Sequence, residues 1–283
     1  MAHPSRSTAP APLNVLVVTI LPDDELPAVL AAFEIPRRQP PLKIGEVSCY
    51  QRRVVTRSHI DLMLTIACLA EQGITSTQAS TSQLLQQLTP QLAILIGCAC
   101  GRKGKTKIGD VVVSTEGVFY YEPMGGDHNP RPKSALPART LASAVAVGMA
   151  PHNLGRLRYV VQLRRALARL RKFAAAPKLR SKRGPQLHFR MIASGEKILT
   201  SAKLDQLAKS NGNIYAGEKE GWGFAFACGS APGLAQRWLV VRGVSDFGAK
   251  AQRERWKLVA TLCAATVARL IVEGVELPRF RGR

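Results

Sequence analysis

The sequence lacks the features of a membrane-spanning or metal-binding protein. No run of about 18 apolar residues occurs, so no membrane-spanning helix is expected. The six cysteines form neither a Cys-X-X-Cys pair nor a cysteine–histidine ligand spacing, which argues against a zinc site. Most of them lie in apolar runs, as buried thiols do in a reducing compartment. We therefore expect a cytoplasmic protein without membrane contact, metal or other cofactor.

Acidic residues are scarce, and one long stretch has none. The formal net charge is +21, from 40 Lys and Arg against 19 Asp and Glu. The stretch from His128 to Gly195 contains no Asp or Glu. Such a basic field attracts polyanions such as nucleic acid or phosphorylated small molecules, although a merely solvated surface is an equal alternative.

Alternating strand and helix patterns predict the fold. The runs Asn14–Leu21, Leu92–Ile96 and Trp238–Val244 are apolar without polar alternation, as in strands covered on both faces. Helices are predicted over 26–33, 78–88, 154–174, 201–211, 222–228 and 255–273. The pattern predicts an α/β fold, a three-layer α/β/α sandwich around a central mixed, twisted sheet.

One domain is expected over residues 13–275. Residues 1–12, rich in Ser, Ala and Pro, lack a signal-peptide core and are expected to be a disordered lead-in. Residues 127–186 are expected to form a basic insertion, with a loop over 125–153, and residues 276–283 a basic tail. In the helix over 154–174, one face is expected to be apolar and the opposite face basic. The apolar set is Leu157, Val160, Val161, Leu167, Leu170 and Ala174, and the basic set is Arg158, Arg165, Arg169 and Lys172.

Polar residues that follow the predicted strands are the candidates for a ligand site. In α/β sheets, ligands bind beyond the C-terminal ends of the strands. These candidates are Asp24, Cys98, Ser194, Glu218, Glu220 and Asp246.

Four segments in order resemble the nucleoside phosphorylase/nucleosidase superfamily over about residues 14–273. They are Ile20-Leu21-Pro22-Asp23-Asp24; Gly97-Cys98-Ala99-Cys100-Gly101 with the run 107–114; Ile192-Ala193-Ser194-Gly195-Glu196-Lys197; and Glu218-Lys219-Glu220-Gly221 with Gly243-Val244-Ser245-Asp246-Phe247. The resemblance implies cleavage of a purine N-glycosidic bond, and homo-oligomers are common in the family.

The resemblance also implies catalytic roles. Asp246 matches the acid that protonates the purine at N7, which is general acid catalysis. Asp24 matches the carboxylate that activates water, where Glu is usual, so its shorter reach is a departure. Each acid has a structural alternative, because Asp246 could cap the following segment and Asp24 could stabilise a helix first turn.

Further positions are implied to bind substrate. Glu220 matches the glutamate on the ribose hydroxyls, and Glu218 matches an acidic neighbour, although both also suit a helix first turn. The remaining implied substrate contacts are Lys219, Cys98, Ala99, Ser194, Glu196, Ile198 and Phe247.

Water is favoured over phosphate as the nucleophile. A phosphorylase needs arginines and a hydroxyl for phosphate, whereas the segment after the first strand is acidic here and Cys98 occupies the hydroxyl position. We therefore expect a nucleosidase, with a phosphorylase as the alternative. A non-catalytic nucleotide sensor or nucleic-acid-binding protein that kept the fold also remains open.

Lys219 is the departure that bears on substrate. The family usually has Met at this position, under the ribose. Lys219, Lys250, Arg253 and Arg255 are candidates for the phosphates of a purine nucleotide such as ATP. Family members joined to bacterial and fungal immune-type proteins, some of which cleave purine nucleotides, resemble this chain, including at Trp256. A methylthioadenosine or adenosylhomocysteine nucleosidase, which needs an apolar 5′ pocket, is the rival.

Overall fold

The computed structural model describes residues 11–36, 38–56, 58–122, 133–150, 154–171, 177, 184–197 and 199–274. The strands are β1 (Leu13–Thr19), β2 (Leu42–Ile44), β3 (Val47–Val55), β4 (Asp61–Cys68), β5 (Leu92–Gly101), β6 (Val111–Val113), β7 (Val118–Tyr120), β8 (Lys133–Ala135), β9 (Leu187–Phe189), β10 (Met191–Ser194), β11 (Ile214–Glu218) and β12 (Trp238–Asp246). The helices are α1 (Glu25–Ala32), α2 (Ile74–Leu88), α3 (Arg139–Gly148), α4 (Leu154–Arg171), α5 (Ser201–Ala208), α6 (Gly221–Gly229), the short 3₁₀ helix η1 (Pro232–Leu234) and α7 (Lys250–Gly274).

The strands form one mixed sheet that branches at β5. In its centre, β1 pairs in parallel with β4 and β5, and β12 pairs in parallel with β5. At Cys100 and Gly101, the end of β5 also pairs antiparallel with β11, which carries β10, β7 and β8 beyond it. The ends of β1, β5, β11 and β12 therefore come together where β5 changes partner.

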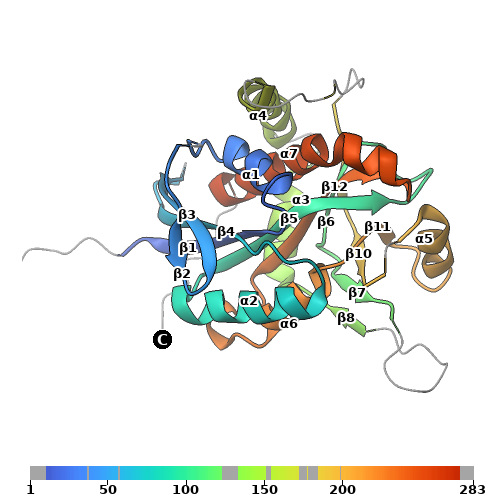
Figure 1. Ribbon diagram of the computed structural model, residues 1–283, viewed down its shortest axis with the longest axis horizontal. Coiled ribbons are helices and arrows are strands. Elements are labelled where there is room, and N and C mark those ends of the chain that lie inside the picture. The colour runs from blue at the N-terminus through green and yellow to red at the C-terminus, as the bar shows by residue number, and fades with distance from the viewer. Residues whose placement is uncertain are drawn as a thin grey trace, which may run out of the picture.

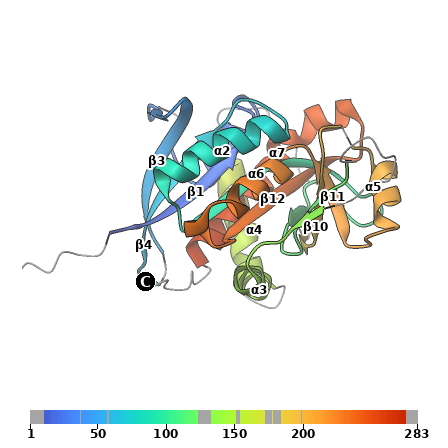
Figure 2. The same cartoon turned by 90° about the horizontal axis from the view of Figure 1, so that it is seen from below.

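Helices cover both faces of this sheet, as Figures 1 and 2 show. Helices α1, α4 and α7 pack on one face, and α3 contributes Leu141 and Val145 to the same apolar cluster. Helices α2 and α6 pack on the other face, where Leu84 and Phe224 are fully buried. The prediction of a three-layer α/β/α sandwich with a mixed sheet is confirmed.

The loop or insertion predicted over 125–153 contains regular secondary structure in the part that the structure describes. Strand β8 and helix α3 lie within it. Helix α3 forms because Leu141 and Val145, one turn apart, are both buried. Residues 1–10 and 275–283, with most of the predicted lead-in and the predicted tail, lie outside the described residues.

The buried face of α4 differs from the predicted one. Its buried residues are Tyr159, Leu163, Ala166 and Leu170, whereas Val161 is 40% exposed. These four positions also have helical spacing, shifted from the predicted stripe. Arg169, predicted to be on the solvent side, instead lies 3.0 Å from the carboxylate of Glu34, at the end of α1.

Glu34 ties α4 to the rest of this layer. Its carboxylate also lies 2.9 Å from Arg269 of α7 and 3.9 Å from Arg52 of β3. The hydrogen bond and charge of Arg269 lower the pKa of Glu34, so the carboxylate is ionised near neutral pH.

Among the described residues, no helix combines the length and apolar character needed to cross a membrane.

Candidate active site

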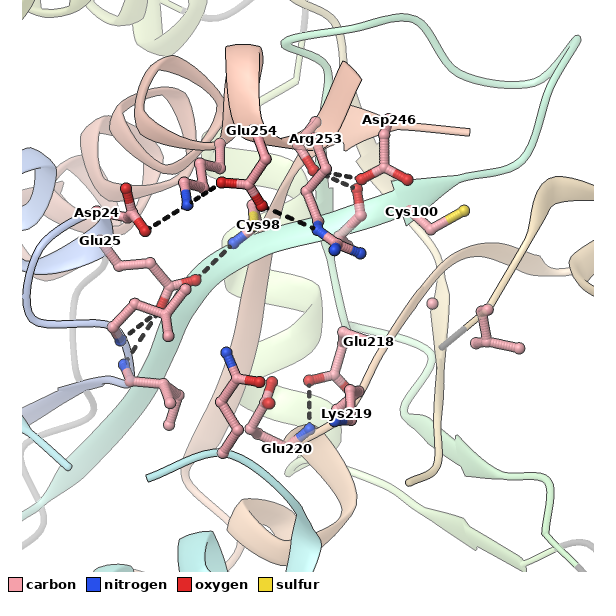
Figure 3. A pocket seen from close by; sticks show the side chains of 18 residues that line it. Asp24, Glu25, Cys98, Cys100, Glu218, Lys219, Glu220, Asp246, Arg253 and Glu254 are labelled. Carbon is pink, nitrogen blue, oxygen red and sulfur yellow. Dashed lines mark hydrogen bonds and ion pairs between the residues drawn. The ribbon is translucent and has the colours of Figure 1, made fainter. Parts of the chain in front are cut away.

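A pocket of about 260 Å³ lies at the point where β5 branches. Its walls come from the loop after β1, the end of β5, the β11–α6 junction, the end of β12 and the first turns of α7, as Figure 3 shows. Its charged lining residues are Asp24, Glu25, Glu218, Lys219, Glu220, Asp246, Arg253, Glu254 and Lys257. Segments far apart in sequence thus bring six carboxylates into one small space.

Asp246 ends β12 and is 2% exposed. Its Oδ2 lies 2.7 Å from the Ser245 hydroxyl, and its Oδ1 accepts a hydrogen bond of 2.7 Å from the Gly248 amide. These two bonds fix the carboxyl group at the pocket wall. Because the Gly248 bond resembles a turn cap, Asp246 both shapes the chain after β12 and faces the pocket.

Glu218 and Glu220 meet Arg242 below Asp246. Glu218 forms a short ion pair with the Arg242 guanidinium and accepts hydrogen bonds from the amides of Glu220 and Gly221. Glu220 Oε2 lies 3.2 Å from Arg242 Nη2. Glu218 therefore holds the start of α6, and with it the backbone of Glu220, in place.

Burial sets the protonation of this cluster. It raises the pKa of Glu220 to about 7, with the Arg242 charge lowering that pKa and the Glu218 charge raising it further. Burial acts to lower the pKa of Arg242, but the surrounding carboxylates raise it above its ordinary value, so it stays charged. A buried charge without partners is costly, so each of these groups depends on the others.

Glu25 lies on the opposite side of the pocket and is 3% exposed. Its Oε2 accepts hydrogen bonds from the Thr19 hydroxyl and the Ile20 amide, at 3.1 and 3.0 Å. Its Oε1 accepts a hydrogen bond of 3.0 Å from the Cys98 amide and lies 3.9 Å from Arg242 Nη1. This carboxylate is therefore oriented from β1, β5 and β12 at once.

Asp24 stands at the mouth instead. Its Oδ2 lies 2.6 Å from Lys257 Nζ, and the same ammonium lies 2.5 Å from Glu254. Lys257 is thus neutralised by two carboxylates and joins α1 to α7. Arg253, one turn before it, extends into the pocket between Asp246 and Cys98 (Figure 3).

Cys98, Ala99 and Lys219, which were predicted to contact the substrate, line the pocket. Burial raises the pKa of the Cys98 thiol to about 12. The thiol therefore stays neutral near pH 7 and is a poor nucleophile, because the thiolate is the reactive form.

Other predicted substrate contacts lie away from the lining formed by the described residues. The Ser194 hydroxyl accepts a hydrogen bond of 2.9 Å from the Trp222 amide in α6. Glu196 accepts one of 2.7 Å from the Ile74 amide at the start of α2. Phe247 packs against the apolar cluster under α6. Ile198 lies outside the described residues.

Of the four basic residues predicted to bind the phosphates of a nucleotide, two line the pocket and two do not. Arg253 and Lys219 line the pocket, whereas Lys250 and Arg255 do not. The Arg255 guanidinium lies over the Trp256 ring, 5.7 Å from its centroid.

Two central residues were missed from the sequence. Arg242 lies within an apolar strand, and a charged residue there requires a buried partner, so its position carried a usable signal. Glu25 directly follows Asp24, and only the path of the chain into α1 decides which of the two faces inward.

Comparison with known proteins identifies the family. A family model described as the phosphorylase superfamily matches residues 16–276. The chain belongs to the phosphorylase superfamily. The resemblance seen in the sequence motifs is therefore confirmed.

Relatives in this superfamily include nucleosidases. The chain is 27% identical over 263 residues to the ATP nucleosidase Cap17 of Escherichia coli. This alignment covers 90% of this chain and 50% of that protein. The chain thus spans about half the length of the curated relatives it matches.

Solved structures show the shared fold. A 5′-methylthioadenosine/S-adenosylhomocysteine nucleosidase from Colwellia psychrerythraea, in complex with adenine, superposes with a TM-score of 0.66 at 16% identity, covering 94% of this chain and 96% of that one. Futalosine hydrolase of Helicobacter pylori gives a TM-score of 0.62 at 13% identity, covering 92% and 97%.

Proposed function

We propose that this chain is a purine N-glycosidase that hydrolyses the bond between base and ribose in a purine nucleotide. The observation that carries the proposal is the convergence of Asp246, Glu220 and Glu25 on one pocket of a phosphorylase-superfamily fold. Each carboxylate has a different part of the reaction within reach.

Asp246 is the proposed general acid. The leaving purine needs a proton at N7, because an anionic base leaves slowly. The carboxyl group of Asp246 is held by Ser245 and Gly248 at the pocket wall, where it can face a bound purine. Positioned proton transfer of this kind contributes about 10²–10⁴-fold to rate.

Glu220 is the proposed ribose contact. Its ionised form accepts hydrogen bonds from the sugar hydroxyls, and its charge favours a sugar that becomes cationic as the bond breaks. The carboxyl groups of Glu25, Glu218 and Glu220 surround the guanidinium of Arg242. Among the described side chains, this guanidinium is the positive charge that pairs with all three. This excess of negative charge stabilises an oxocarbenium-like transition state, since fixed charges act strongly in a site shielded from water.

Glu25 is the proposed water-activating carboxylate, in place of Asp24. Glu25 is buried and its carboxylate is fixed by amides of Ile20 and Cys98. Asp24 is bound to Lys257 at the mouth. A base must lie within hydrogen-bond reach of the water it deprotonates, and Glu25 has the inward position.

The negative charge of Glu25, on the side of the pocket where the nucleophile would bind, favours hydrolysis over phosphorolysis. Glu25 would repel a phosphate there, and Arg242 beside it already pairs with carboxylates. The relatives named nucleosidase or hydrolase agree with this choice.

A nucleotide is favoured over a thioether substrate by the mouth of the pocket. Arg253 lines the pocket there and extends a guanidinium into it, where an apolar wall would suit a 5′-methylthio group, whereas Lys257 is already paired with Asp24 and Glu254. A relative named ATP nucleosidase supports the same choice. The homo-oligomer and the cytoplasmic location stay predictions.

The test is release of free purine, followed by chromatography. The protein is incubated with adenosine, methylthioadenosine, adenosylhomocysteine, AMP and ATP, with and without phosphate. We expect release without phosphate, fastest from a nucleotide. Release only with phosphate would indicate a phosphorylase, and no release from any substrate would favour a non-catalytic sensor.

A further inference from the structure

We propose that the outer face of α4 binds the sugar-phosphate backbone of double-stranded nucleic acid, independently of base sequence. Four arginines on this face are exposed: Arg158, Arg164, Arg165 and Arg171. None of them forms an ion pair with another described residue. This surface is separate from the pocket and is not used by the proposed hydrolysis.

The inner face of α4 holds these arginines in a fixed array. Tyr159, Leu163 and Leu170 are buried against α1 and α7, and the Arg169–Glu34 ion pair adds a polar tie. Figure 1 shows α4 as the outermost helix of its layer. Guanidinium groups on a docked helix lose less conformational freedom on binding than groups on a free loop.

The spacing forms two parallel rows. Arg158 and Arg165 are two helical turns apart, as are Arg164 and Arg171. The four span about 20 Å along the axis, from a rise of about 1.5 Å per residue. A duplex presents one phosphate charge per about 1.7 Å of its axis, so several phosphates fall within the length of the two rows.

Nearby acids do not neutralise this surface. The described part of the chain from 133 to 195 contains no Asp or Glu. Glu34, the acid that the described ion pairs place against α4, is already engaged with Arg52, Arg169 and Arg269. The positive charge of the outer face therefore remains available to a polyanion.

The chemistry of the face selects nucleic acid rather than a membrane. A helix that lies in a bilayer surface needs large apolar residues opposite its charges. Among the described side chains of α4, those of residues 158–171, the exposed apolar ones are Val161, at 40% exposure, and Ala168, while Leu163 and Leu170 are buried in the core. Arginine also forms paired hydrogen bonds with phosphate oxygens.

Base stacking is not part of this surface. The one aromatic residue of α4 in the described chain, Tyr159, is fully buried. Single-strand binding relies on aromatic platforms, so contact through the backbone of a duplex fits better.

The experiment is fluorescence anisotropy with labelled duplex DNA, duplex RNA and single strands, and co-sedimentation with phosphatidylserine vesicles. We expect duplex affinity to fall about 100-fold between 50 and 200 mM salt, as four phosphate contacts require. The variant Arg158→Gln/Arg164→Gln/Arg165→Gln/Arg171→Gln should lose most of the affinity and of the salt dependence, with purine release unchanged.

The matched control neutralises four exposed lysines elsewhere, Lys103→Gln/Lys105→Gln/Lys203→Gln/Lys209→Gln. Equal loss in the control, or an unchanged affinity in the α4 variant, would overturn the proposal, as would binding to vesicles but not to duplex. If the quadruple variant does not fold, Arg158→Gln/Arg165→Gln serves, with about half the change in salt slope expected.

Discussion

The carboxylate of Glu25 accepts a hydrogen bond of 3.0 Å from the Cys98 amide, which fixes a buried acid against the central strand of the sheet. Its neighbour Asp24 points to the mouth and binds Lys257 at 2.6 Å. Two adjacent acids therefore have different surroundings, and the difference assigns them different roles.

Glu25→Gln should reduce the rate of base hydrolysis by about 10²–10⁴-fold, as expected for loss of a general base. Asp24→Asn should leave kcat for adenosine within a few-fold, because its partner Lys257 still pairs with Glu254. Steady-state kinetics of both variants check this assignment. A large loss in Asp24→Asn with a small one in Glu25→Gln would return the role to Asp24.

The pH profile reports on Glu220. Burial raises its pKa to about 7, so the carboxyl group is protonated below that pH and ionised above it. Since the ionised form binds the ribose hydroxyls, kcat/KM should rise about tenfold per pH unit up to about pH 7, above which ionisation of Glu220 adds no further increase. Glu220→Gln should lower kcat/KM and abolish this limb. A wild-type profile that is flat down to pH 5 would contradict the assignment.

Arg253→Gln tests the nucleotide preference. Loss of a charge-assisted hydrogen bond costs about 1.5–3 kcal/mol, so KM for ATP should rise about 10–100-fold while adenosine is little affected. Arg255→Gln is the matched control, since its side chain lies over Trp256 and away from the pocket. Equal changes in KM for ATP and adenosine in Arg253→Gln would show that Arg253 does not contact a phosphate of the substrate.

Gly243→Ala tests the packing that positions Asp246. An added Cβ would overlap the backbone carbonyl of Ala260, so β12 and α7 would have to separate. We expect the free energy of unfolding to fall by about 1–3 kcal/mol or more, measured by denaturant titration. Gly148→Ala is the control, because no atom lies within 4 Å of its added Cβ. Similar stability of the two variants would contradict this close packing.

Motif order was sufficient to predict the fold and much of the pocket. Asp246, Glu218 and Glu220 stand at or just after the ends of strands, so the strand pattern named them as candidates and the family resemblance implied that they share a site. Ser194, which the strand pattern also named, and Glu196, which the resemblance named, lie outside the pocket lining of the described residues and bond to the starts of α6 and α2.

The remaining errors have separate causes. The inward turn of Glu25 depends on the backbone of the short segment before α1, which alternation of apolar residues does not define. Arg242 was treated as part of an apolar run, although its burial among three acids organises the site. The buried face of α4 depends on how the helix docks on α1 and α7, a tertiary property.

The central claim is hydrolysis with Asp246 as the acid. The most direct test is cleavage of ATP in phosphate-free buffer made with heavy-oxygen water, by the wild type and by Asp246→Asn. We predict that the wild type releases adenine and a sugar product carrying the heavy oxygen, and that Asp246→Asn binds ATP with similar Kd but releases adenine at least about 100-fold more slowly. Wild-type release that requires phosphate, or an undiminished rate in Asp246→Asn, would contradict the account.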